Sequence, residues 1–361
     1  MPRSLRLALV LCASALAGSA LAAEPAPPPD RDAIEARWAQ AFDAEIARLQ
    51  KKFTGIMAVY VSDPTLGVRY GYRADKPSYL ASAVKLAFMI EVFRQRREGL
   101  LTLDEELTFT EEDIRDGAPK MNAKKMGAKV SIRELLELMM HHSDNAASDM
   151  LAHRVGLDNV SFGLRSQGYA GFTPLTSLLD VRRGVFREVD IRSDDLKPAD
   201  IRAIRWITGW QAQTRKLEEL LGRPQNTYGR DEIQAAFDRY YETGVNSARL
   251  DAVGAILEAL NARKLINAEA SEAMITLMRG AETSRRRILG RLPAGTKVAH
   301  KTGSQHERVC DIGLIDLPDG RPLVFAACMA GGHDVTLAEA NIADLARKGY
   351  DLAIESHKSL H

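Results

Sequence analysis

The order of strand-like and helix-like segments constrains the fold of this chain more than any other sequence feature. Residues 55–62 and 67–72 read as a hairpin of two strands, and strand-like runs return near the other end at 296–302, 308–316 and 322–330. The middle is helical in its periodicity, at 82–98, 131–142, 145–155, 248–262 and 267–280. This order predicts a mixed α/β fold: an antiparallel sheet built from N- and C-terminal strands, flanked by helices, beside an all-helical lobe.

One catalytic domain over 31–361 accommodates these segments. Its sheet lobe would comprise about 31–80 and 282–361, with amphipathic helices at each end of the chain covering the sheet. Its helical lobe would span about 81–281. Within it, residues from about 191 to 245 form a polar helix pair split by GRPQNTYG, which we interpret as an insertion. A site is expected in the cleft between the lobes.

The N-terminus follows the pattern of an export signal. Arg3 and Arg6 precede an apolar stretch from Leu7 to about Ala17, and ALA at 20–22 supplies the small residues of a cleavage site. We therefore expect a signal peptide over 1–23, a Pro-rich spacer over 24–30, and a periplasmic or secreted protein. The apolar stretch is too short for a transmembrane anchor. Bulky Leu11 before Cys12 argues against a lipoprotein.

The charge of the chain limits its partners. The formal net charge is +1, and no basic block with interleaved aromatic residues occurs, so we expect no nucleic acid or anionic membrane as partner.

Cleavage of the signal peptide would leave two cysteines, Cys310 and Cys328, on either side of the turn signal LPDG. A cross-strand disulfide is possible in an oxidising compartment. Two buried free thiols are the alternative, which we slightly favour.

A lysine stands inside the apolar run YLASAVKLAFM at residues 79–89. Ser82 and Lys85, at i and i+3, would share one face of a helix, with Ser82 at its N-terminus, where free N–H groups favour negative charge. Apolar neighbours would leave the Lys85 ammonium poorly solvated and lower its pKa. A partly neutral lysine can accept the proton of a serine and so activate it as a nucleophile. The structural alternative is a capping serine and a snorkelling lysine.

Two later stretches offer polar groups suited to the same chemistry. HHSDNAASDML at 141–151 places a hydroxyl, a carboxylate and an amide in succession, from Ser143 to Asn145, although Ser143 could simply cap a helix. VAHKTGSQ at 298–305 ends a predicted strand with Lys301, a hydroxyl and Gly303. Gly303 would let a substrate lie against the backbone like an extra strand. An edge strand that runs into a turn is the alternative.

The motifs S-x-x-K, S-D-N and K-T-G, in this order, are the set of class A β-lactamases and penicillin-binding proteins. The chain resembles that superfamily, and class A in particular, over nearly all of its mature length. The flanks at 80–107, 131–152 and 290–304 extend the resemblance beyond the motifs. It implies the fold of that family and a serine-based acyl transfer.

The resemblance implies catalytic roles at five positions. Ser82 would attack a carbonyl and carry the acyl group, with Lys85 as its proton acceptor. Ser143 would pass a proton to the departing nitrogen. Asn145 would bind the amide of the substrate's side chain and steady Lys85, and Lys301 would lend positive potential to Ser143 and to the substrate carboxylate.

The remaining implied contacts bind the substrate. The Thr302 and Ser304 hydroxyls would hold its carboxylate, and the backbone N–H groups of Ser82 and Ser304 would form an oxyanion hole. Gly303 completes this strand. Arg308 lies near where some members place a carboxylate-binding arginine, although the turn SQHER here differs in length and composition.

The sequence departs from class A at the deacylation step. Class A enzymes carry E-x-x-L-N about 36 residues after the S-D-N serine, and its glutamate activates the hydrolytic water. No such motif occurs at 174–190, where the counted positions are Leu178 and Leu179. The nearby carboxylates do not match the required spacing; they are Asp180, Glu188 and Asp190.

The leading hypothesis is an exported serine hydrolase of β-lactamase type that opens the β-lactam amide, with slow deacylation possible. A peptidase acting on D-Ala-D-Ala ends of peptidoglycan is the first alternative, and a non-hydrolytic penicillin-binding protein is the second. The expected partner is a small β-lactam or a peptidoglycan peptide, and we expect a monomer without a cofactor. We also expect no metal, because the spacing of the histidines fits no zinc motif; the four considered are His141, His142, His300 and His306.

Overall fold

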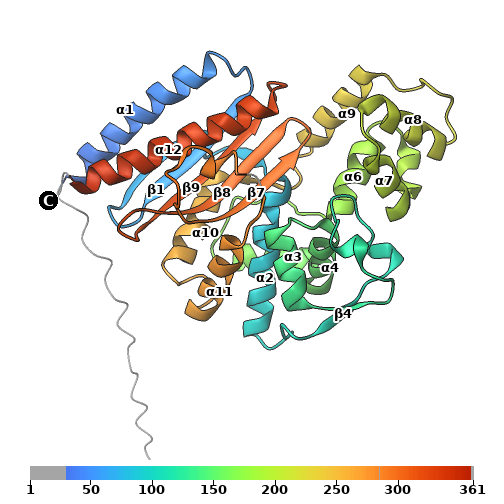
Figure 1. The fold of residues 1–361 in the computed structure, drawn as a ribbon, viewed down its shortest axis with the longest axis horizontal. Helices are drawn as coiled ribbons and strands as arrows, with labels where there is room; N and C mark the ends of the chain where they lie inside the picture. The colour runs from blue at the N-terminus through green and yellow to red at the C-terminus, as the bar shows by residue number, and fades with distance from the viewer. Residues whose placement is uncertain (1–29, 284, 359–361) are drawn as a thin grey trace, which may run out of the picture.

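The computed structural model describes residues 30–283 and 285–358, and Figure 1 shows their arrangement. The predicted signal peptide, Cys12 and the spacer up to residue 29 lie outside the described residues. Five strands form an antiparallel sheet in the order β2-β1-β9-β8-β7. Their bounds are β1 (Ile56–Asp63), β2 (Val68–Tyr72), β7 (Val298–Gln305), β8 (Arg308–Asp316) and β9 (Pro322–Ala330). N- and C-terminal strands thus share one sheet, as predicted, and the mixed α/β fold class is confirmed.

Two terminal helices cover one face of this sheet, α1 (Arg31–Gln50) and α12 (Val335–Lys358). Apolar side chains recur along α1 at helical spacing, so that Trp38, Phe42 and Ile46 are buried against the sheet. Burial of this stripe is the main stabilising term for such a layer.

The helical layer packs on the opposite face of the sheet, where one apolar core joins the two. The central helix is α2, whose residues from Lys85 to Phe93 are all buried. The helices of this layer are α2 (Lys85–Arg97), α3 (Ile132–His141), α4 (Asn145–Val155), α5 (Leu157–Ser166), α10 (Leu250–Asn261) and α11 (Ala268–Arg279). Two small two-stranded sheets accompany them, β3 (Pro77–Tyr79) with β6 (Ser247–Arg249) and β4 (Glu106–Thr108) with β5 (Lys129–Ser131).

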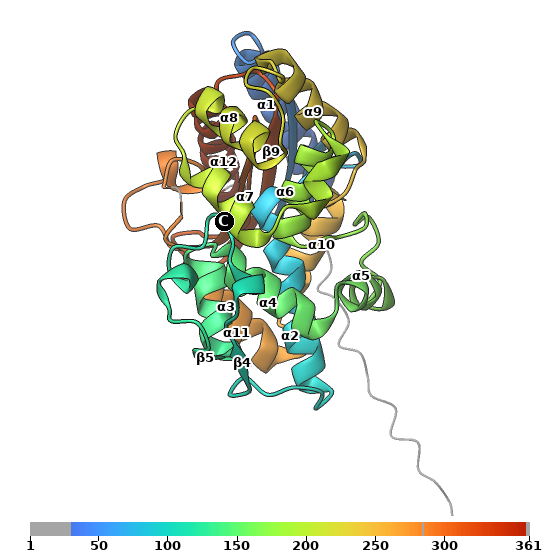
Figure 2. The ribbon, with the colours of Figure 1, turned by 90° about the vertical axis from the view of Figure 1, so that its right-hand side faces the viewer.

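The segment predicted as an insertion forms a separate helical cluster beside the sheet (Figure 2). It follows α6 (Leu178–Arg187) and contains η4 (Ile191–Asp195), α7 (Pro198–Trp206), α8 (Trp210–Leu220) and α9 (Arg230–Glu242). Helices α8 and α9 flank the GRPQNTYG stretch, as expected. A small core of Ile201, Ile204, Leu217 and Tyr228 holds the cluster together, and it includes Leu179 of α6.

The cysteine pair corrects one expectation. Cys310 on β8 pairs directly with Cys328 on β9 in the strand register, and their sulfurs form a disulfide bond. Directly opposed residues on an antiparallel pair project to the same face of the sheet. The preference for two free thiols is therefore wrong.

Within residues 30–283 and 285–358, no helix combines the length and the apolarity that crossing a membrane requires.

Candidate active site

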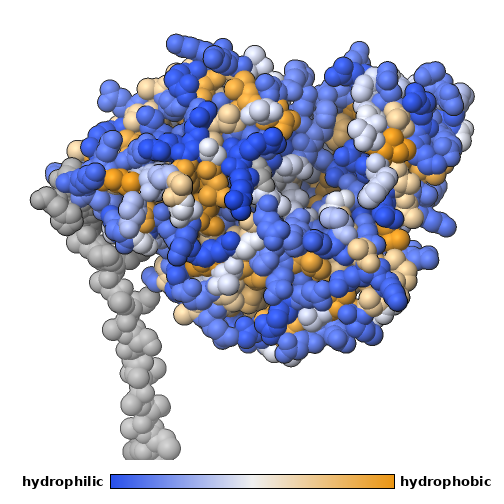
Figure 3. Space-filling view, in the orientation of Figure 1, coloured by the Kyte–Doolittle hydropathy of each residue, from blue (hydrophilic) through white to orange (hydrophobic). Residues whose placement is uncertain are grey.

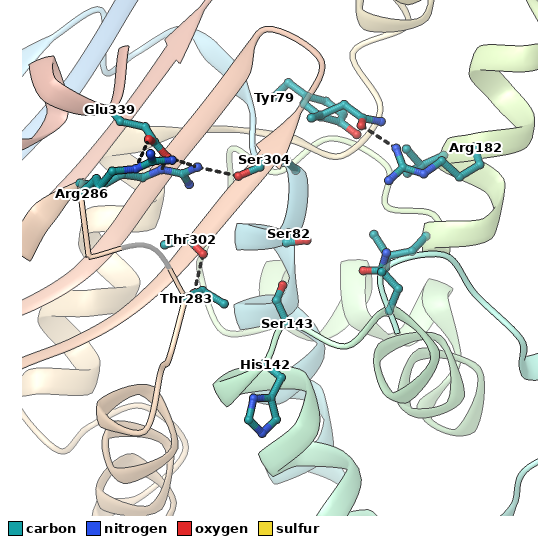
Figure 4. A pocket seen from close by; sticks show the side chains of 17 residues that line it. Tyr79, Ser82, His142, Ser143, Arg182, Thr283, Arg286, Thr302, Ser304 and Glu339 are labelled. Atoms are coloured by element: carbon teal, nitrogen blue, oxygen red, sulfur yellow. Dashed lines mark hydrogen bonds and ion pairs between the residues drawn. The ribbon is translucent and has the colours of Figure 1, made fainter. Parts of the chain in front are cut away.

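A cavity of about 480 Å³ opens where the edge strand β7, the helical layer and α6 meet. In Figure 3 the surface is hollowed in this central region, and Figure 4 shows the side chains inside. Ser82 and Ser143 lie next to each other at its centre. The polar lining residues from the predicted motifs are Ser82, Ser143, Asn145, Thr302 and Ser304. The structure therefore brings the three motifs to one cavity.

Ser82 lies on a tight turn, η1 (Ala81–Val84), immediately before α2. Ala81 has a φ of 48°, in the left-handed region that non-glycine residues seldom adopt. Such strain persists only where the surroundings fix it, and it is common at functional sites.

Strand β7 packs closely against this turn. At Gly303, an added Cβ would overlap the Leu80 carbonyl oxygen and crowd the Ala83 nitrogen. The glycine therefore permits β7 to approach the serine turn, whereas from the sequence alone we expected it to permit the approach of a substrate.

Lys85 begins α2 and is completely buried. Its Nζ donates to the Ser143 carbonyl oxygen at 2.6 Å, to Ser143 Oγ at 3.1 Å and to Asn145 Oδ1 at 2.8 Å. Burial lowers the pKa of Lys85 to about 7, although Asp144 and Asp149 oppose the shift. The amine is therefore close to half neutral near pH 7, which is the condition for a general base.

Ser143 occupies the connection between α3 and α4 with a φ of 56°. Asp144 fixes this connection, because its carboxylate caps α4 through the Ala147 N–H and also accepts from the Met121 N–H. The middle residue of S-D-N is thus structural, and its neighbours on each side face Lys85.

A second buried lysine contacts the same hydroxyl. Lys301 Nζ donates to Ser143 Oγ at 2.9 Å and to the Thr302 carbonyl oxygen at 2.9 Å. Burial, reinforced by the nearby Lys85, lowers the pKa of Lys301 well below its ordinary value. Ser143 Oγ therefore lies between two amines, which makes it a suitable proton relay.

Hydroxyls and guanidinium groups gather at one end of the cavity (Figure 4). The hydroxyl oxygens of Thr302 and Thr283 are 2.7 Å apart, and Arg287 Nη2 donates to Ser304 Oγ at 2.6 Å. Arg286 lines the cavity beside them, and both arginines pair with Glu339. This end is suited to an anion.

Arg308 does not reach that end of the cavity. Its guanidinium stacks over the ring of Tyr241 on α9, 4.1 Å from the centroid, and lines a separate cavity. The expectation of a carboxylate-binding Arg308 is thus not met. Arg286 and Arg287 lie there instead, and the basic run at 285–287 is the sequence signal that could have indicated them.

The first turn of α6 forms the wall opposite. Asp149 Oδ1 accepts from the Leu178 N–H at 2.6 Å, and its Oδ2 accepts from the Leu179 N–H at 3.0 Å, while Ser177 caps the helix. Leu178 consequently lines the cavity, whereas Leu179 packs into the core beneath α7 and α8. At the position where the class A spacing would put the glutamate, this chain therefore presents the apolar side chain of Leu178 to the site.

The nearby carboxylates are held elsewhere. Asp180 accepts from the Ser177 hydroxyl, Glu188 pairs with Arg239, and Asp190 binds Arg223 and Tyr228. Among the described residues that line the cavity, Glu339 is the one carboxylate, and it pairs with the arginines at the anion-binding end.

Sequence reasoning missed two further side chains at the α6 wall. Arg182 lines the cavity, pairs with Asp116 at 2.9 Å and donates to Gln305 Oε1 at 2.5 Å. Asp116 has a lowered pKa, because Arg182 and Arg205 outweigh the opposing effect of its burial. No local motif marks these positions, which are brought together by packing.

Comparisons with known proteins agree with this geometry. A family model described as the β-lactamase enzyme family matches residues 41–353. The extended-spectrum β-lactamase PER-1 of Pseudomonas aeruginosa is 25% identical over 294 residues, covering 78% of this chain and 77% of PER-1. A β-lactamase of Bacteroides uniformis is 31% identical over 130 residues, covering 34% of this chain and 43% of that protein.

Solved structures show the same fold. The β-lactamase of Sphaerobacter thermophilus has a TM-score of 0.65 at 21% identity, covering 88% of this chain and 97% of that one. PBP-A has a TM-score of 0.64 at 18% identity, covering 87% and 96%. With the family model matched over most of its length and the three motifs around one cavity, this chain belongs to the β-lactamase enzyme family of serine hydrolases.

Proposed function

We propose that this protein opens the amide of β-lactams through an ester intermediate on Ser82. The observation that carries the proposal is the environment of Lys85, which is buried with a pKa of about 7 one turn after Ser82. A snorkelling lysine would keep its ammonium in water, whereas this amine contacts Ser143 and Asn145 inside the protein.

Acylation begins with proton transfer. Neutral Lys85 accepts the Ser82 hydroxyl proton as Oγ forms a bond to the β-lactam carbonyl carbon, and the carbonyl oxygen becomes an oxyanion. We assign the oxyanion role to the backbone N–H groups of Ser82 and Ser304, a role supported by the serine turn and the edge strand β7 adjoining the cavity.

Collapse of this intermediate breaks the carbon–nitrogen bond. Ser143 donates its hydroxyl proton to the departing nitrogen and recovers one from Lys85, now an ammonium, so that protons balance. Lys301 keeps the potential at Ser143 Oγ positive through its contact at 2.9 Å. The substrate carboxylate would lie at the end of the cavity with Thr302, Ser304 and Arg286.

Hydrolysis of the ester is expected to be slow. A deacylating water needs a base beside the Ser82 ester, and Leu178 occupies the wall where class A enzymes have their glutamate. An apolar side chain there excludes water from the position that it should occupy. The acylated protein would therefore accumulate.

The apolar wall also supports a second candidate, a D-Ala-D-Ala peptidase. In such an enzyme Lys85 could serve both half-reactions, so a carboxylate base would not be needed. Among the structural neighbours, a PBP-A variant has been solved as an acyl-enzyme complex with penicillin G. A non-hydrolytic penicillin-binding protein would stop at that stage.

The proposal includes export. Residues 1–23 carry the features of a cleaved signal peptide, and peptidoglycan and β-lactams meet outside the cytoplasm. N-terminal sequencing of protein recovered from the periplasm should then begin near Glu24.

One experiment separates the candidate functions. Turnover of a chromogenic cephalosporin and release of D-alanine from a D-Ala-D-Ala peptide are measured side by side for the wild type and Ser82→Ala. A β-lactamase turns over the cephalosporin, a peptidase releases D-alanine, and a penicillin-binding protein only forms the adduct. Activity that survives in Ser82→Ala would remove Ser82 from all three.

A further inference from the structure

A second cavity, lined largely by apolar side chains and here called the apolar extension, adjoins the catalytic cavity beneath the helical cluster. This extension has a volume of about 400 Å³, and it shares Arg182, Ser304 and Gln305 with the lining of the catalytic cavity. Side chains from α6, α7, α8 and α9 form its apolar wall: Phe186, Ile204, Trp210, Leu217, Ile233 and Phe237. Segment 191–245 therefore supplies most of the wall of a cavity that shares three lining residues with the site.

The junction between the two hollows has an excess of positive charge. Asp116 pairs with Arg182 at 2.9 Å and with Arg205 at 3.7 Å, so that two guanidinium groups share one carboxylate. Among the described residues that line the extension, there is no Asp or Glu. Partial burial and the like charge of Arg182 lower the pKa of Arg205, although Asp116 opposes the shift. A further anion at this junction would offset the repulsion between the two guanidinium groups.

Gln305 adds a donor at the same place. Its Oε1 accepts from Arg182, whereas its Nε2 is buried and has no hydrogen bond of normal geometry to the described residues. Burial raises the pKa of the neighbouring Tyr79 to about 12, and the Gln305 side chain partly opposes that rise. An acceptor oxygen on a ligand would satisfy Gln305 Nε2 better.

The acyl arm of a substrate bound for attack by Ser82 would extend toward this junction. Its ring carboxylate would occupy the end with Thr302, Ser304 and Arg286, and Ser82 lies at the centre of the cavity (Figure 4). The acyl arm, which is attached to the attacked carbonyl, must leave toward the opposite end. Arg182 lies at that end.

We propose that Arg182, Arg205 and Gln305, with the apolar extension behind them, form a subsite for an acyl arm that carries a carboxylate beside an apolar group. The carboxylate would contact the guanidinium groups and Gln305 Nε2, and the apolar group would enter the hollow beneath α7–α9. The inference rests on the proposed function, because the arm reaches this subsite only if Ser82 is the residue acylated.

Three penicillins that differ at one carbon test the charge preference. Benzylpenicillin, its α-amino derivative and its α-carboxy derivative have the same ring system and phenyl group but a neutral, positive or negative substituent. The second-order rate constant for acylation of the full-length mature protein is measured for each. The α-carboxy compound should exceed the α-amino compound by at least about tenfold.

Substitutions on α7 test whether Arg205 causes this charge preference. Arg205→Gln should reduce this ratio at least about fivefold, and Arg205→Lys should retain most of it. Arg202→Gln is the matched control, since it removes an arginine that stacks over Trp206 on the same helix, and it should leave the ratio unchanged. Equal rates for the three penicillins, or a ratio that Arg205→Gln does not alter, would overturn the subsite. If none of the three acylates Ser82, the proposed function itself fails.

Discussion

Lys85 is expected to control how fast a penicillin acylates Ser82. An ordinary lysine with a pKa of 10.5 would be neutral in only about 3 molecules in 10⁴ at pH 7, whereas a pKa of about 7 makes about half of the molecules neutral. Burial therefore increases the available base by about a thousandfold. Lys85→Ala should slow acylation by about 10² to 10⁴, the usual contribution of a general base.

The pH dependence gives an independent readout of the same group. The neutral amine is the reactive form and predominates above its pKa, so the acylation rate should rise with pH and level off above about pH 8. The neutral fraction predicts an increase of about tenfold between pH 6 and pH 8. Stopped-flow fluorescence with a labelled penicillin measures this rate in single turnovers.

A variant of Lys301 shows whether the midpoint of the pH dependence belongs to Lys85 or to Lys301. Burial and the nearby Lys85 lower the pKa of Lys301, and the two protonated amines repel each other. Lys301→Gln removes this repulsion, so the midpoint assigned to Lys85 should persist and move upward. An acylation rate that does not change between pH 6 and pH 8, or that Lys85→Ala leaves intact, would refute the assignment of Lys85 as the base.

Three further outcomes follow from the surroundings of the site. Leu178→Glu introduces a carboxylate into the cavity wall and should shorten the lifetime of the acyl adduct at least about tenfold, as measured by intact-mass time courses. Leu178→Gln is the matched control, and equal effects of the two substitutions would contradict a base role for the new carboxylate. Gly303→Ala should slow penicillin labelling and destabilise the fold by about 1–3 kcal/mol, because its Cβ would overlap the Leu80 carbonyl; an unchanged melting temperature would argue against this packing. Reduction of the Cys310–Cys328 bond should cost about 3 kcal/mol of unfolding free energy in denaturant titrations, and identical curves with and without reductant would disprove a disulfide there.

The motifs allowed much of the site to be predicted, since each joins several functional groups over a short span. Ser82, Lys85 and Ser143 do lie together, because the serine turn and the α3–α4 connection converge at the edge strand that carries Lys301. The fold class followed from the placement of strands at both ends of the chain.

The remaining features depend on register and packing, which no short pattern encodes. The disulfide follows from the direct pairing of Cys310 with Cys328, and a shift of one residue would have separated their side chains. Arg308 was assigned to the cavity by proximity in sequence, although the structure turns it toward Tyr241. The pair of Arg182 with Asp116 joins positions 66 residues apart, and its partners could not be inferred before the helices were placed.

The most direct test of the account is the mass of the intact protein after mixing with benzylpenicillin. The wild type should gain the mass of one whole penicillin within seconds, because ring opening loses no atoms, and it should retain that mass for minutes. Peptide mapping should place the adduct on Ser82, and Ser82→Ala should show none while it melts close to the wild-type temperature. An adduct on another residue, or one that persists in Ser82→Ala, would contradict the central claim. Rapid product formation without a detectable adduct would instead show that an efficient deacylating base exists.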